Sequence, residues 1–110
     1  MKINWDFEEA VALVNTYINV TEKGFDEQTE IQALSDILVK RADILGIEHD
    51  DIYRNPTGIN MKLKNIEYLA TDGKSGLSSY SLVDKKALEL YNKLPETFEL
   101  IIKEFKQKYK

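Results

Sequence analysis

The sequence predicts an all-α domain of about five helices, and three observations lead to this prediction. Apolar residues recur at helical intervals in five segments. Residue types that favour helix starts and ends stand between these segments. The 110 residues include no cysteine and are 43% hydrophobic, so one core without disulfide bonds is expected. Residues 1–110 should therefore form a single compact domain.

Helix boundaries are predicted from capping residues: Asp6 with Glu9, Asp26 or Thr29, Gly46, Asn55 with Pro56, Ser81 with Asp84, and Pro95. They place the helices in this order: about 6–20, from Asp26 or Thr29 to Gly46, from Pro56 to about Ala70, from Ser81 to Pro95, and from Pro95 to the C-terminal lysines. A β-branched run near the end of the first segment has some strand character, but its apolar spacing favours a helix.

The third predicted helix has two different faces. An apolar face is expected in the core: Ile59, Leu63, Ile66 and Ala70. Burial in the core does not account for the residues of the opposite face, which are Met61, Lys64, Asn65 and Tyr68. Residues 71–80 contain two glycines and several small polar residues, which predicts a loop, and Leu77 is expected to anchor it.

The charge is unevenly distributed along the chain. The formal net charge is −4, yet residues 1–52 hold 4 basic and 12 acidic side chains, whereas residues 53–110 hold 11 basic and 7 acidic ones. A polyanion could therefore contact the second half while the acidic half faces solvent or another domain. Chance or solubility would explain the same asymmetry.

The N-terminal residues lack the apolar core of a signal peptide. No stretch approaches the roughly 20 apolar residues that a membrane span requires. A cytoplasmic protein without membrane contact is the expectation.

None of the candidate catalytic or metal-binding motifs has the residues and spacing that its chemistry requires. His49, Asp50 and Asp51 are consecutive loop residues that rarely converge on one ion, and there is no second histidine. Glu104 and Lys106 resemble part of a nuclease motif, but two residues apart on a helix they point in nearly opposite directions. Gly73-Lys74-Ser75 lacks the rest of a phosphate-binding loop. We expect no catalytic residue, no metal and no cofactor.

Polar residues cluster at the start of the third predicted helix, where free backbone N–H groups favour anions. Asn offers the donor and acceptor pair that an adenine edge requires. The predicted DNA-binding residues are Arg54, Asn55, Asn60, Lys62, Lys64, Asn65 and Lys74. The alternative is that Asn55 only caps the helix, Asn65 bonds a neighbouring loop and the lysines form an ordinary exposed face.

Several short motifs resemble a known family. They are Arg54-Asn55-Pro56, Gly58-Ile59, Met61-Lys62-Leu63, Asn65, Gly76-Leu77-Ser78 and Asp84, together with Trp5, Glu8-Glu9, Ala12 and Ala33-Leu34-Ser35. This pattern, which covers nearly the whole chain, resembles the helical N-terminal domain found ahead of HNH-nuclease modules in bacterial restriction and defence proteins. Two departures are the net acidity and Tyr53, where a Phe is expected.

The resemblance implies that nuclease chemistry belongs to a downstream HNH module, so this chain would be a stand-alone relative or an N-terminal fragment of a larger protein. It implies recognition of double-stranded DNA, including modified DNA, with Arg54, Lys62 and Asn65 at the matching polar positions. The alternative function is a protein-interaction module, in which the acidic first half or the surface of Met61 and Tyr68 docks a partner subunit.

Overall fold

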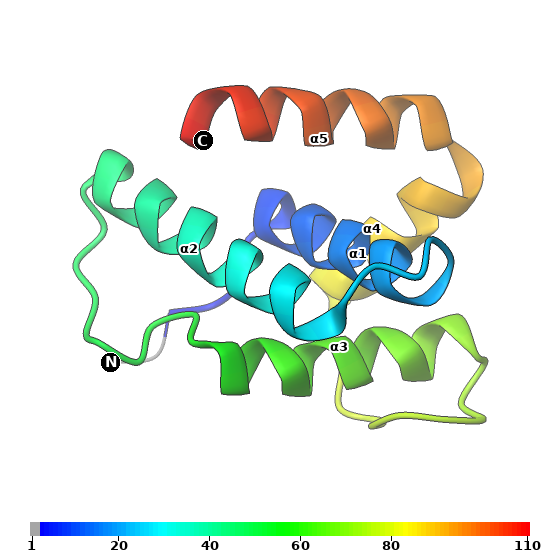
Figure 1. Cartoon of the computed structure of the whole chain (residues 1–110). Coiled ribbons are helices and arrows are strands. Elements are labelled where there is room, and N and C mark those ends of the chain that lie inside the picture. The colour runs from blue at the N-terminus through cyan, green and yellow to red at the C-terminus, as the bar shows by residue number, and fades with distance from the viewer. Residues whose placement is uncertain (1–2) are drawn as a thin grey trace.

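The computed structural model describes residues 3–110, and in this part of the chain it contains five α-helices and no strand. They are α1 (Phe7–Thr21), α2 (Glu27–Leu45), α3 (Pro56–Ala70), α4 (Leu82–Lys93) and α5 (Pro95–Tyr109). The predicted all-α fold is thus confirmed. Figure 1 shows α1 at the centre, with α5 on one side and α3 on the other, while α2 and α4 complete the enclosure.

Helix α1 is central because its sequence is suited to burial on nearly every side. Its buried residues are Glu9, Ala10, Val11, Ala12, Leu13, Val14, Thr16, Ile18 and Asn19. A helix that buries several adjacent positions needs neighbours around its whole circumference. The other four helices supply them, and each presents one apolar stripe to α1.

The capping residues act as the sequence predicts. Asp6 and Glu9 form a complete capping box at α1, and Ser81 and Asp84 form another at α4. The Asn55 carboxamide accepts a hydrogen bond from the Gly58 backbone N–H at 2.9 Å, directly before the Pro56 that begins α3. Each side chain satisfies a backbone donor that has no partner within its helix.

One expected core residue is not buried, and the expected anchor of the 71–80 loop acts through its backbone. Ala70 is exposed, because α3 runs one turn past Ile66, its last fully buried residue. The Leu77 side chain is also exposed, and the loop is anchored instead by the Leu77 backbone N–H, which donates to the Lys64 carbonyl at 3.0 Å. The Leu77 backbone therefore fixes the loop against α3, and the Tyr80 ring adds a side-chain contact by stacking on Tyr68 with the ring centroids 6.1 Å apart.

Helices α4 and α5 are joined with no intervening loop. Leu94 is both the C-cap of α4 and the N-cap of α5. Pro95 lacks a backbone N–H, so it ends one helical hydrogen-bond ladder and begins the next. No helix in residues 3–110 is long and apolar enough to cross a membrane.

Gly76 and Gly24 provide a matched pair that tests how closely the 71–80 loop approaches α3. Both have positive φ, at 93° and 71°. A Cβ on Gly76 would overlap the Lys64 carbonyl and lie 2.7 Å from the Tyr68 backbone nitrogen, whereas a Cβ on Gly24 would meet nothing within 4 Å.

We therefore expect Gly76→Ala to destabilise the fold by more than about 2 kcal/mol and Gly24→Ala by about 1 kcal/mol. Urea denaturation measures both values. Equal losses would contradict the close packing of the loop.

Candidate functional site: a polar cleft

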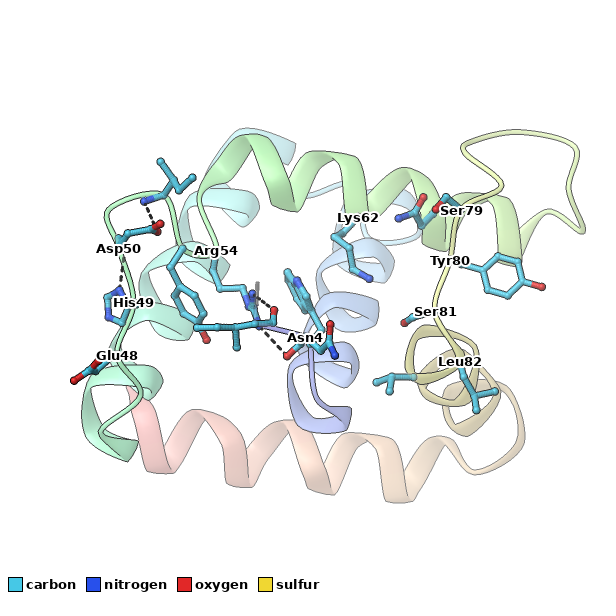
Figure 2. Close-up of a pocket in the computed structure, with 16 residues that line it drawn as sticks. Asn4, Glu48, His49, Asp50, Arg54, Lys62, Ser79, Tyr80, Ser81 and Leu82 are labelled. Atoms are coloured by element: carbon cyan, nitrogen blue, oxygen red, sulfur yellow. Dashed lines mark hydrogen bonds between the residues drawn. The ribbon is translucent and has the colours of Figure 1, made fainter. Parts of the chain in front are cut away.

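A cleft of about 980 Å³ lies where the N-terminal segment, the α2–α3 connection and the start of α4 meet one face of α3. Its lining comes from the N-terminal residues 3–5, the α2–α3 connection and residues 79–83 at the start of α4, together with Lys62 and Asn65 of α3. Figure 2 shows the 48–50 segment on one side and the 79–82 segment on the other, with Arg54, Asn4 and Lys62 between them. The Tyr80 ring points away from this central group.

The floor of the cleft is built on an ion pair between Arg54 and Glu9. The Arg54 Nε lies 2.6 Å from Glu9 Oε2, and its Nη2 donates to Glu9 Oε1 at 3.0 Å. The side chains are 7% and 2% exposed. The Arg54 guanidinium also donates to the backbone carbonyls of Ile3 and Asn4, both at 3.2 Å. The ion pair therefore fixes the N-terminal segment against α1 and the α2–α3 connection.

Aromatic and cationic side chains form a continuous stacked row along this floor. The His49 and Tyr53 rings stack with centroids 4.8 Å apart. The Arg54 guanidinium lies 4.3 Å from the centroid of Tyr53 and 4.7 Å from that of Trp5. The Lys62 ammonium lies 5.3 Å from the Trp5 centroid. Burial raises the pKa of Tyr53, and the nearby Glu9 carboxylate raises it further. Cation–π contacts of this kind stabilise both partners.

The backbone at Arg54 is in the left-handed region, with φ of 48°. This conformation is unfavourable for a residue with a side chain, so the surroundings must hold it in place. A hydrogen bond from the buried Ser35 hydroxyl to the Arg54 carbonyl, at 2.8 Å, does so. The strained backbone aims the guanidinium inward, towards Glu9, rather than towards solvent.

A second ion pair lies at the α4 side of the cleft. The Lys62 ammonium is 2.6 Å from Oδ2 of Asp84, whose side chain is fully buried. The same Oδ2 accepts the Ser81 backbone N–H at 3.3 Å within the α4 capping box. Oδ1 of Asp84 is buried without a hydrogen-bond partner in the described residues, and so is Oδ1 of Asn65.

The cleft retains unused hydrogen-bonding capacity. The Lys62 ammonium has three donors and gives one to Asp84. Asn65 lies one turn further along α3 and lines the same cleft, and its buried carbonyl oxygen accepts nothing. A buried acceptor without a donor is costly, so a ligand or water that supplied one would be favoured. A group that both accepts and donates hydrogen bonds suits this position.

The structure brings three of the seven predicted DNA-binding residues together: Arg54, Lys62 and Asn65 line the cleft. Asn55 caps α3, as in the alternative interpretation. Asn60 and Lys64 lie on another flank of α3, around a small cavity of about 60 Å³ that they share with Glu67. Lys74 is exposed in the 71–80 loop.

The expectation that Arg54 grips a phosphate from the helix N-terminus does not fit this geometry. Its charge is balanced by Glu9, and four of its five N–H groups are used within the chain. Lys62 is likewise paired with Asp84. Neither cation is available as a free phosphate ligand, although both still line the cleft.

Sequence reasoning missed the partners that organise the site: Glu9, Trp5, Tyr53 and His49. Glu9 has the spacing of a capping box with Asp6, but no local pattern pairs it with an arginine 45 residues away. Trp5 is the residue before the Asp6 N-cap, where an apolar side chain commonly packs on its own helix, so its position gave no sign that it would stack on Arg54.

Comparisons with protein-family models, with curated proteins and with solved structures gave no match to this chain. Within residues 3–110, no group of three or more side chains of His, Asp or Glu is arranged to hold a metal ion.

The ion pair predicts that Arg54→Ala is primarily a stability variant. It would leave the Glu9 carboxylate charged and buried without its partner, at a cost of about 3–5 kcal/mol in the free energy of unfolding. Urea denaturation followed by circular dichroism gives this value.

Lys108→Ala serves as the control, because Lys108 is 58% exposed and lies 4.0 Å from Glu8. Its loss should stay below about 1 kcal/mol. A cost for Arg54→Ala no greater than that of the control would show that the Glu9–Arg54 pair does not support the fold.

Proposed function

We propose that this chain is a non-catalytic DNA-recognition module of a bacterial, HNH-associated restriction or defence protein, and that the cleft is its recognition site. The observation that supports the proposal is the pairing of unused donors on Lys62 with an unsatisfied acceptor on Asn65, one helical turn apart. A base edge presents donors and acceptors side by side, so it could satisfy both groups. The motif resemblance around Arg54 and Asn65 favours DNA as the ligand.

The charge balance of the cleft indicates which residues would contact the phosphates and which would contact the bases. Arg54 and Lys62 are neutralised by buried carboxylates, so they add little net attraction for phosphate. Two exposed lysines near the start of α4 can contact the DNA backbone: Lys74 and Lys85. Phosphate contacts position DNA and base contacts specify its sequence. We therefore expect modest affinity with a shallow salt dependence.

A protein-interaction module is the second candidate, and one observation favours it. Ile52 and Leu82 lie on the lining of the cleft and are 70% and 65% exposed. Large apolar side chains at the rim of a concave surface are typical of protein-binding sites. In that case the unused polar groups of Lys62 and Asn65 would contact a peptide backbone.

Trp5 makes the test direct, because it is the only tryptophan in the chain and lies in the cleft. Titration with duplex and with single-stranded DNA at low salt should change its fluorescence if DNA enters the cleft. Asn65→Ala should weaken binding by about 1–3 kcal/mol if Asn65 contacts a base edge. Lys74→Ala should weaken binding uniformly and reduce the salt slope by about one unit.

Lys23→Ala is the matched control, since Lys23 is an exposed lysine in the turn after α1, outside the cleft. It should leave affinity unchanged. No change in Trp5 fluorescence at millimolar DNA, with the protein folded, would reject DNA binding in the cleft. Ile52→Ser and Leu82→Ser would then test the protein-interaction candidate, since loss of apolar rim area should abolish capture of a partner.

A further inference from the structure

His49 forms a bridge between the end of α2 and the segment that walls one side of the cleft. Its Nε2 lies 2.8 Å from Oδ1 of Asp43 on α2, and its Nδ1 lies 3.0 Å from the Asp50 carbonyl oxygen. The ring is also stacked on Tyr53. Figure 2 shows His49 between Glu48 and Asp50 along this wall.

Both ring nitrogens face groups that can only accept hydrogen bonds. A neutral imidazole has one N–H and one lone pair, so it can satisfy only one of the two contacts. The protonated ring donates from both nitrogens, and only that form satisfies the Asp43 carboxylate and the Asp50 carbonyl together. The geometry therefore favours the charged state of His49.

The charges around His49 favour the same state. Asp43 faces it from α2, and Asp50 and Glu48 flank it in the connecting segment. The Tyr53 ring covers one face and separates His49 from the Arg54 guanidinium, whose charge Glu9 balances. The hydrogen bond to the Asp50 carbonyl raises the pKa of His49 above 6.5, and the bond to Asp43 raises it further.

We propose that protonated His49 braces the 47–53 segment at both Asp43 and Asp50, and that loss of the proton gives up one of these two hydrogen bonds and so loosens this wall of the cleft. The consequence does not depend on which ligand the cleft binds. The contact with the Asp50 carbonyl matters most for the wall, because the same carbonyl accepts the Tyr53 backbone N–H at 3.4 Å. Releasing His49 would loosen the turn that leads into Tyr53 and Arg54.

The direction of the pH effect follows from the raised pKa. The stabilisation by the bridge is complete below pH 6.5, the ordinary pKa of histidine, and is lost as the pH rises through the higher value in the folded protein. The wall is therefore held more tightly in mildly acidic solution and less tightly in alkaline solution.

NMR tests the proposal directly, because His49 is the only histidine in the chain. Its imidazole signals should titrate with a midpoint above 6.5, and the backbone amide shifts of residues 47–53 should follow the same midpoint. Asp43→Asn should lower the midpoint, because it removes the charge opposite Nε2. Asp51→Asn is the control, since Asp51 is an exposed neighbouring acid that does not line the cleft; it should shift the midpoint less.

His49→Gln should abolish the titration of the 47–53 amides while the rest of the spectrum stays folded. A His49 midpoint at or below 6.5 would overturn the proposal. So would amide shifts in residues 47–53 that titrate unchanged in His49→Gln, or an Asp43→Asn midpoint equal to that of the unmodified protein.

Discussion

The Glu9 carboxylate is the constraint on which the site depends. Its two oxygens accept the Asp6 backbone N–H, two N–H groups of Arg54 and the Tyr53 hydroxyl at 3.5 Å. One side chain thus completes the cap of α1 and neutralises the arginine that holds residues 3 and 4. A buried carboxylate is tolerated only when its acceptors are satisfied in this way. The Glu9–Arg54 pair thus joins α1, the N-terminal segment and the α2–α3 connection beside the cleft.

The two ion pairs, Arg54 with Glu9 and Lys62 with Asp84, limit the kinds of ligand that such a cleft could recognise. Where cations are free, binding is dominated by phosphate and carries little sequence information. Here the cations of the floor are already paired, so under the proposed function discrimination would come from hydrogen-bond geometry at Lys62 and Asn65. Such a site discriminates by leaving polar groups unpaired when the wrong ligand enters. The same reasoning holds for a base edge and for a peptide backbone.

The fold could be predicted from the sequence because its determinants are local. Capping boxes such as Asp6 with Glu9 act within three or four residues, and the helical apolar stripes act within a few turns. The site could be predicted only in part. Lys62 and Asn65 share a helix face, so their proximity followed from helix geometry, whereas the partner of Arg54 lies on α1. A long-range ion pair produces no periodic pattern in the sequence. The left-handed backbone conformation that turns Arg54 inward has no sequence pattern either.

The two connections around α4 differ in how much change in chain length they can accept. Between α4 and α5 the single residue Leu94 serves both helices, so an insertion there would rotate the α5 stripe of Phe98 and Phe105 away from α1. The 71–80 loop lies over α3 on the surface and is fixed chiefly near Gly76 and Leu77. Related sequences should therefore vary in length before Gly76 while keeping the single-residue connection between α4 and α5 unchanged. Such variation would change the surface over the C-terminal end of α3 without disturbing the core.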